Sequence, residues 1–279
     1  MQLIVFSKMF RERTLPELAQ LAHDYGFEGY DLCVRPGYPI NPDNAGYELS
    51  AAVSYFVEQG LCVPMVTANF DVLSPDHPTA RPILAAMDKA DVRLIKLGYF
   101  SFDPRTMDYW AEVDRIRSLF EGWEKLGREY NVKVCYHTHS HHCMGLNCGM
   151  LAHLIQGFDP QYIGAYIDPG HMNAEGEEFA VGAAIIRRYL SIIGLKDSLP
   201  RREETDSRHG RKIMRWVQAG QGTVDWTAVF DELGRIEFTG PLSVHCEFDV
   251  AGEAFGRAFR SEVAFFGAQR DRVAPPLAS

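Results

Sequence analysis

The stretch Val132-Lys133-Val134-Cys135-Tyr136-His137-Thr138-His139 predicts a strand that ends in two imidazoles. The side chains of a strand alternate between its faces, so Val134 and Tyr136 share one side while His137 and His139 share the other. The first side is apolar enough to lie beneath helices, and the second becomes polar at its C-terminal end. We therefore expect a chemical site to begin where this strand stops.

Three later strand-like runs also end in polar groups. One ends in Asp168 with His171 close behind it, the next in Lys196, and the last in His245 and Glu247. Polar side chains at the C-terminal ends of strands are typical of an active site at the mouth of a β/α barrel. The remaining sequence is expected to supply the scaffold that brings these ends together.

Short apolar runs alternate with longer helical patterns along the whole chain. The predicted strands are Leu3–Ser7, Gly29–Cys33, Leu61–Ala68, Val92–Gly98, Val132–His139, Ile163–Asp168, Leu190–Lys196 and Leu242–Glu247. The predicted helices are one from Thr14 to a stop at Gly26, then Tyr47–Gln59, Pro78–Ala90, Thr106–Tyr130, Cys148–Gln156, Glu177–Arg188, Trp226–Leu233 and Glu253–Phe266. Eight such units close a barrel.

The fold class expected is therefore α/β, a single-domain (β/α)8 TIM barrel over residues 1–268 with a flexible C-terminal tail over 269–279. A length of 279 residues suits one such barrel, which takes about 250. A doubly wound open sheet is the alternative. The segment Phe6-Ser7-Lys8-Met9-Phe10 after the first strand lacks the glycine-rich phosphate fingerprint of that fold, so the barrel is favoured.

One connection, Asp197–Thr223, is unusually long and contains Arg201, Arg202 and the basic run Arg208–Lys212. A solvated, mobile loop is the simpler interpretation. A substrate lid that contacts anions is the sharper one.

Composition limits the classes of function. A net charge of −9 argues against a nucleic-acid groove, because phosphate backbones demand clustered Lys and Arg. No apolar run approaches the ~20 residues of a membrane span, and the start carries neither a basic region nor a cleavage site for secretion. A small-molecule partner is expected, and assembly into a homo-oligomer stays open.

The six cysteines are scattered, which suits buried, reduced thiols in a cytoplasmic protein. Cys143 and Cys148 lie close in sequence to the histidines, which leaves a soft-metal role open, although they do not form a paired CxxC zinc motif.

Each candidate has a structural alternative. Two histidines at a strand end can be satisfied polar residues, Asp168 before Pro169-Gly170 can belong to a turn, and Lys196 can form a structural ion pair. A buried Glu247 without a partner would be costly, so a metal or another cation is expected beside it. Asp31, Asn69 and Lys96 are weaker candidates.

Four motifs carry a resemblance to a known family: Asp168-Pro169-Gly170-His171, Gly194-Leu195-Lys196-Asp197, Gly220-Gln221-Gly222-Thr223-Val224-Asp225-Trp226 and Gly240-Pro241-Leu242-Ser243-Val244-His245-Cys246-Glu247. With the order of elements, they resemble the xylose isomerase-like barrels of the sugar phosphate isomerase/epimerase superfamily. That superfamily includes ketose 3-epimerases, hydroxypyruvate isomerases and inosose dehydratases. The resemblance covers positions 1 to 267.

The resemblance implies one divalent ion, held by carboxylates from the fifth and eighth strands, an Asp from the sixth and a His from the seventh. The sixth-strand ligand corresponds to Asp168, with His171 as its substrate-side neighbour. This chain departs from the pattern with His137, Gly194 and His245 at the other three positions. Such a set would suit Mn, Zn, Co or Fe better than Mg. The alternative is that the ion has been lost.

The function expected is a sugar or sugar-phosphate isomerase or epimerase that uses metal-assisted proton transfer next to a carbonyl. The expected metal ligands are His137, Asp168 and His245, with His139 as a further candidate. The expected catalytic residues are Glu247 or His171 as base, His139 as acid and Lys196 as an oxyanion contact. Alternatives are a metal-dependent dehydratase or lyase of the inosose dehydratase type, a hydrolase of modified sugars, and a non-catalytic sugar-binding barrel. The DNA-repair endonucleases of the superfamily are disfavoured by the acidic balance.

Overall fold

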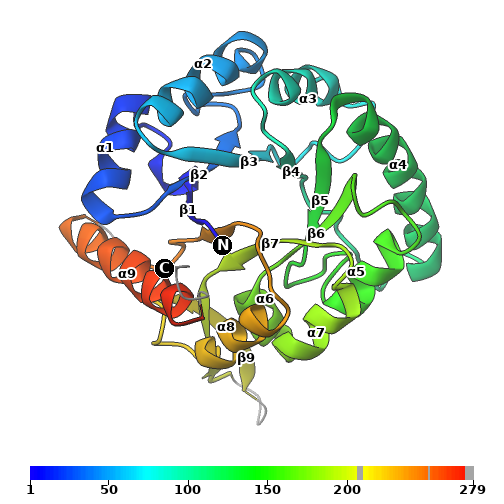
Figure 1. Ribbon diagram of the computed structural model, residues 1–279. Helices are drawn as coiled ribbons and strands as arrows, with labels where there is room; N and C mark the ends of the chain where they lie inside the picture. Colours follow the sequence, from blue (N-terminus) through cyan, green and yellow to red (C-terminus); the bar gives the residue numbers. More distant parts are fainter. Residues whose placement is uncertain (206–209, 251, 274–279) are drawn as a thin grey trace.

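The computed structural model describes residues 1–205, 210–250 and 252–273, and its centre is a closed barrel of parallel strands (Figure 1). The barrel strands are β1 Leu3–Phe6, β2 Gly29–Val34, β3 Cys62–Ala68, β4 Leu94–Lys96, β5 Lys133–His137, β6 Ile163–Ile167, β7 Leu190–Leu195 and β10 Leu242–Val244. Their order around the barrel is β1-β10-β7-β6-β5-β4-β3-β2, with β1 pairing β2 to close the ring. The predicted (β/α)8 barrel is confirmed.

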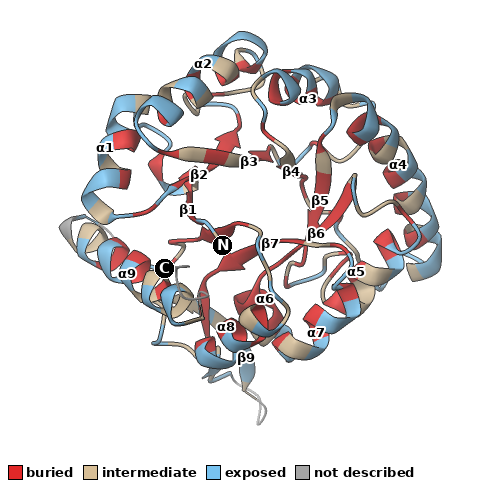
Figure 2. Ribbon diagram, viewed as in Figure 1, coloured by how far each residue is buried: buried red, intermediate tan, exposed pale blue. Residues whose placement is uncertain are grey.

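Helices surround the barrel and bury their inward faces against it, as Figure 2 shows. Their bounds are α1 Leu15–Tyr25, α2 Ala45–Glu58, α3 Ala80–Lys89, α4 Tyr109–Tyr130, α5 Cys148–Ile155, α6 Pro169–Glu175, α7 Phe179–Ile186, α8 Trp226–Arg235 and α9 Glu253–Val273, with a 3-10 turn η1 at Ser7–Phe10. No helix in the described part of the chain is long and apolar enough to cross a membrane.

The alternation predicted for β5 is confirmed by its packing. Val134 and Tyr136 belong to the large core between strands and helices, whereas Cys135 packs inside the barrel against a small cluster that includes Tyr166. His137 follows the parity of Cys135, so it faces the barrel interior at the C-terminal end of the strand.

The long connection after β7 is an antiparallel hairpin rather than a loop. Its strands are β8 Asp197–Glu203 and β9 Arg211–Val217, and residues 206–209, which include Arg208, lie outside the described part. The β-branched and aromatic residues Ile213, Trp216 and Val217 favour a strand here. The hairpin projects from the ring of helices near α8 (Figure 1).

Asp197 fixes the base of this hairpin. Its two carboxylate oxygens accept hydrogen bonds from four backbone N–H groups, those of Ser198, Gly220, Gly222 and Val224, at 2.8–3.3 Å. The residue is fully buried. Gly222 allows this approach, because a Cβ there would lie 2.0 Å from an oxygen of Asp197.

Two boundaries differ from expectation. The helix α9 continues through Val273, beyond the barrel end expected at 268, so residues 269–273 are helical rather than a loose tail, and 274–279 lie outside the described part. Asp168 begins the short helix α6 instead of forming a turn, because its side chain caps the first backbone N–H groups of that helix.

Candidate active site

The C-terminal ends of four adjacent barrel strands bring together most of the predicted site residues. His137 ends β5, Asp168 follows β6, Lys196 follows β7 and His245 follows β10, and all four are buried. Asp168 Oδ2 lies 3.9 Å from His137 Nε2 and 3.7 Å from Lys196 Nζ. Residues far apart in sequence thus line one cup, as the strand-end pattern indicates.

Asp168 presents one free carboxylate oxygen to this cup. Its Oδ1 accepts hydrogen bonds from the backbone N–H groups of Gly170 and His171, at 2.8 and 3.1 Å. Its Oδ2 is buried and has no hydrogen-bond partner within the described part of the chain. Burial raises the pKa of Asp168 to about 6, although Lys196 and the cap hydrogen bonds lower it. A carboxylate in this setting is a stronger base than one in water.

His137 is buried, and neither of its ring nitrogens forms a hydrogen bond with a residue that the structure describes. Burial, together with the positive charge of Lys96, holds its pKa well below the ordinary value, so the imidazole is neutral. Its ring meets Tyr166 edge to face at 4.2 Å between centroids. A neutral imidazole has one donor nitrogen and one acceptor nitrogen, and both remain available to a bound ligand.

His171, in α6, is fixed in one tautomer. The backbone N–H of Ser140 donates to its Nδ1 at 3.1 Å, and the Ser140 hydroxyl lies 2.7 Å from the same atom. Burial and the charge of Lys196 lower its pKa well below the ordinary value. Because Nδ1 accepts, the proton of the neutral ring sits on Nε2, which is buried and unpartnered. His171 therefore offers an N–H donor.

His139 lies between two rings, with centroids 4.1 Å from Tyr99 and 4.2 Å from His171. Its Nδ1 donates to the backbone carbonyl of Ser140 at 2.8 Å. Burial lowers the pKa of His139 to about 4, so the ring is neutral and a weak acid. Its neighbours His141 and His142 are both exposed and do not enter the site.

Glu247 and Lys196 form an ion pair, with Glu247 Oε2 2.7 Å from Lys196 Nζ. The other oxygen of Glu247 pairs with Lys8. Burial opposes ionisation of Glu247, but the charges of Lys196 and Lys8 outweigh it and hold its pKa well below the usual range. The expected cation beside Glu247 is therefore a pair of lysines.

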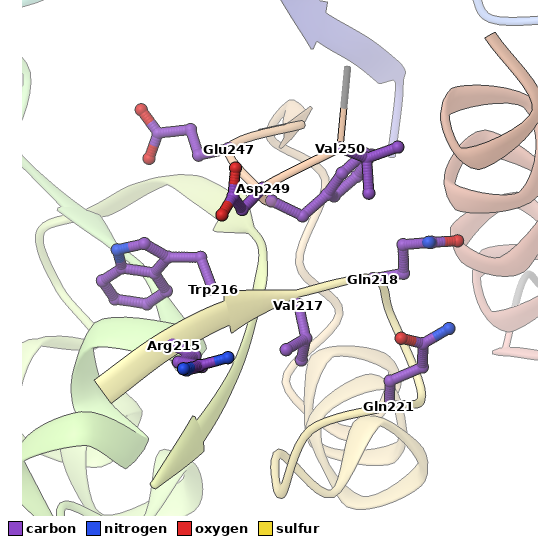
Figure 3. Close-up of a pocket in the computed structure, with 9 residues that line it drawn as sticks. Arg215, Trp216, Val217, Gln218, Gln221, Glu247, Asp249 and Val250 are labelled. Carbon is purple, nitrogen blue, oxygen red and sulfur yellow. The ribbon is translucent and has the colours of Figure 1, made fainter. Parts of the chain in front are cut away.

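Trp216 of β9 covers this ion pair, since Lys196 Nζ lies 4.3 Å from its ring centroid. The indole also meets His171 edge-on at 4.7 Å. Figure 3 shows Glu247 and the indole of Trp216 directed toward the same side of a cleft between β9 and the loop after β10. The cleft measures about 470 Å³ and leads from solvent to this end of the site.

His245, the third expected metal ligand, is turned to a different partner. Its Nε2 lies 2.7 Å from the hydroxyl of Tyr166, and its ring is parallel to that of His137 with centroids 6.3 Å apart. In the described part of the chain, no three His, Cys, Asp or Glu side chains converge closely enough to hold an ion. The expected ligand set is not assembled, so the residues do not fit a three-ligand ion site.

The sequence did not point to Tyr166, Trp216 or Tyr99, and it indicated Ser140 as one of the polar residues that follow the fifth strand without giving it a role. Tyr166 stands in an apolar run and resembles a core residue, and Trp216 stands in a connection taken for a loop. The signal for Trp216 was the strand-forming composition around it. Tyr99 and Ser140 act as neighbours of the histidines, which spacing alone does not reveal.

The weaker candidates separate into two kinds. Asp31 is fully buried inside the barrel, where it accepts hydrogen bonds from Thr67 at 2.6 Å and Ser243 at 3.0 Å. Lys96 is buried with its ammonium 4.1 Å from the Tyr99 ring centroid. The Asn69 side chain donates to its loop neighbour Asp71 at 2.9 Å, which supports the turn interpretation.

A family model described as xylose isomerase-like TIM barrel matches residues 19–266. A comparison with curated protein sequences gives no match.

Solved structures give similar folds. The 3-keto-D-glucoside 4-epimerase YcjR from E. coli has a TM-score of 0.73 at 16% identity, over 96% of this chain and 99% of the epimerase. The probable 3-DHS dehydratase AsbF from Bacillus anthracis has a TM-score of 0.69 at 15% identity, over 96% and 99%. The IolI protein, solved with a zinc atom, has a TM-score of 0.70 at 15% identity, over 98% and 99%.

Proposed function

Because the chain belongs to the xylose isomerase-like TIM barrel family, we propose that it is an isomerase or epimerase that moves a proton next to the carbonyl of a sugar-derived substrate. One observation carries the proposal. Four buried polar atoms of three mouth residues, both nitrogens of His137, Asp168 Oδ2 and His171 Nε2, have no hydrogen-bond partner among the residues that the structure describes. Buried polar groups are normally paired, so a polar ligand is expected to complete them.

Asp168 is the base in this proposal. Its Oδ2 removes the proton from the carbon next to the substrate carbonyl, and the electron pair moves onto the carbonyl oxygen to give an enediolate. In an isomerisation the same carboxyl group returns the proton to the former carbonyl carbon, while the proton of the neighbouring hydroxyl passes to the former carbonyl oxygen. In an epimerisation solvent protonates the opposite face of the enediolate, and Asp168 gives up its proton to solvent. Asp168 takes this role because its Oδ2 is the carboxylate oxygen of the predicted site residues that accepts no hydrogen bond from the described part of the chain.

Two donors serve the oxygen that becomes negative. The Lys196 ammonium has Glu247 as its hydrogen-bond partner and keeps N–H groups for a ligand. His171 offers its Nε2–H from a ring fixed by Ser140. Donors fixed in place before the reaction stabilise developing charge without reorganisation.

Glu247 receives a different role from the one expected. Both of its oxygens are engaged by lysines, and its lowered pKa makes it a weak base. We assign it to positioning Lys196. His139 is reassigned in the same way, because its donor nitrogen is engaged by the Ser140 carbonyl and its neutral ring is a weak acid.

A sugar-like substrate suits the lining of the site. Neutral imidazoles of His137 and His171 can each bond a hydroxyl group, and the indole of Trp216 offers a flat face to the C–H groups of a sugar ring. Sugar substrates appear in the names of similar folds, such as the 3-keto-D-glucoside 4-epimerase. Metal assistance is not part of the proposal, because His245 Nε2 is engaged by Tyr166 and no three candidate ligands converge in the described part of the chain.

A dehydratase is the second candidate. After Asp168 removes the neighbouring proton, the same carboxyl group passes it to the departing β-hydroxyl, which leaves as water, while the Nε2–H of His171 donates a hydrogen bond to that oxygen. The fold similarity to a probable dehydratase supports keeping this reaction beside the first. Both reactions begin with the same proton removal and differ in the fate of the enediolate.

Hydrogen exchange with solvent tests the shared first step. The protein is incubated with a panel of keto-sugars in D2O, and deuterium next to the carbonyl is followed by NMR and mass spectrometry. We expect incorporation into at least one sugar, with product analysis separating epimer from dehydrated product. A panel that shows ligand binding but no exchange contradicts the proposal and favours a non-catalytic sugar-binding barrel.

A further inference from the structure

A lysine stands among the carboxylates at the barrel mouth. Resting on the proposed function, we propose that the Lys196 ammonium takes the place of a divalent ion, so that this barrel reacts without a metal. The ammonium lies 2.7 Å from Glu247 Oε2 and 3.7 Å from Asp168 Oδ2. A cation shared by two carboxylates is the arrangement that a metal would otherwise provide.

The fold holds Lys196 closely in this position. At Gly170 in α6, an added Cβ would lie 2.3 Å from the backbone oxygen of Lys196 and 3.1 Å from its Cγ. Only glycine therefore lets α6 approach the end of β7 so tightly. From the opposite side Trp216 covers the ammonium, and the residue is 5% exposed.

Two departures from the family's ligand pattern, at positions 194 and 245, reduce the space for an ion. A Cβ at Gly194 would lie 3.0 Å from a ring carbon of Tyr166 and 3.1 Å from Asp168 Oδ2, so the Tyr166 ring borders the place of a seventh-strand ligand. The hydroxyl of the same tyrosine engages His245 Nε2. The Tyr166 ring thus borders position 194, which has no ligand side chain, and the Tyr166 hydroxyl engages the ligand atom of His245.

The positive charge of Lys196 also disfavours a divalent ion at this site. A divalent ion at Asp168 would lie close to the ammonium that already pairs with that carboxylate, and like charges about 4 Å apart repel strongly at a partly buried site. The ammonium also has a chemical advantage for the proposed reaction. It is a fixed positive charge with N–H groups directed by Glu247, so it can bond an enediolate oxygen directly.

Metal titration tests the inference without any substrate. Isothermal calorimetry with Mn²⁺, Co²⁺ and Zn²⁺ is run on chelator-treated wild-type protein, on Lys196→Met and on Lys8→Met. We expect the wild type to bind each ion more weakly than about 1 mM. Lys196→Met, which removes the positive charge beside Asp168 and frees Glu247 Oε2, should bind at least about a hundredfold more tightly.

Lys8→Met is the matched control, because Lys8 also pairs with Glu247 but has no contact with Asp168 within ion-pair distance among the described residues. It should not gain this affinity. Stoichiometric, tight ion binding by the wild type overturns the inference, and so does a folded Lys196→Met protein with no gain. The wild-type result decides the matter even if the variant does not fold.

The exchange assay then separates this inference from the proposed function. Exchange that persists in chelator supports both, whereas exchange that needs an added ion keeps the function and overturns the role of Lys196. If no sugar exchanges while the titrations behave as expected, the proposed function fails and the position of the cation stands.

Discussion

The ends of β6 and β7 each hold a fully buried aspartate, and the two differ in what surrounds the carboxylate oxygens. Asp197 accepts four backbone N–H groups, so both of its oxygens are satisfied. Asp168 accepts two such groups on one oxygen, and its other oxygen accepts no hydrogen bond from the described residues. The first pattern describes a structural residue and the second a residue that awaits a ligand. Position in the barrel alone does not distinguish them.

The same substitution at both positions tests this comparison most strongly. Asp168→Asn keeps an oxygen for the cap of α6, because asparagine caps helices as well as aspartate does. Exchange activity should fall by about 10²–10⁴-fold, since the base is lost. The free energy of unfolding, measured in urea, should change by no more than about 1 kcal/mol. Unchanged exchange would remove Asp168 from the mechanism.

Asp197→Asn should show the opposite effect. The amide nitrogen that replaces one oxygen cannot accept from Gly220 and Gly222, which leaves buried N–H groups unpaired. We expect the free energy of unfolding to fall by about 2–4 kcal/mol. Activity per folded molecule should fall less than in Asp168→Asn. A stable Asp197→Asn protein would show that the base of the hairpin does not need this carboxylate.

Glu262 of α9 sharpens the comparison, because it also has an unpartnered buried oxygen but lies beside Asp197 and Cys246, not among the site residues. Burial raises the pKa of Glu262 to about 8, with an opposing hydrogen bond from Ala219 N–H. The folded pKa is above the ordinary value, so the contribution to stability is fully present below about pH 4.5 and is lost as pH rises through about 8.

Glu262→Gln should therefore lose this pH dependence. Relative to wild type, its free energy of unfolding should rise by about 1–3 kcal/mol between about pH 5 and pH 8, as measured by urea denaturation at each pH. Exchange activity should be unchanged, because Glu262 takes no part in the proposed reaction. Parallel stability curves for the two proteins would contradict the raised pKa.

Trp216→Ala gives the smallest expected effect. Loss of the indole above Lys196 and beside His171 should raise KM by about tenfold with a smaller change in kcat. Trp216→Phe should recover most of this loss because it retains an aromatic face. Equal KM values for the three proteins would show that the hairpin does not contact the substrate.

The sequence predicted the barrel and the convergence of the strand ends because both follow from side-chain periodicity. The alternation through Cys135 and His137 predicts that the imidazole faces the inside of the barrel, where the structure has it. The sequence does not predict the hydrogen-bond partners of the site residues, because these depend on contacts between separate strands. His245 was therefore expected to hold an ion and instead meets Tyr166. Trp216 was missed because its hairpin does not belong to the repeated βα pattern.

The hydrogen bond between Tyr166 and His245 has a consequence for how such sequences can change. Restoring a bulky residue at Gly194 displaces the tyrosine ring, and removing the tyrosine leaves a buried imidazole nitrogen unpaired at a cost of about 1–3 kcal/mol. A single replacement at position 166 or 194 therefore does not return the barrel to an ion-binding form without a loss of stability. Related sequences are therefore expected to vary at positions 166, 194 and 245 together.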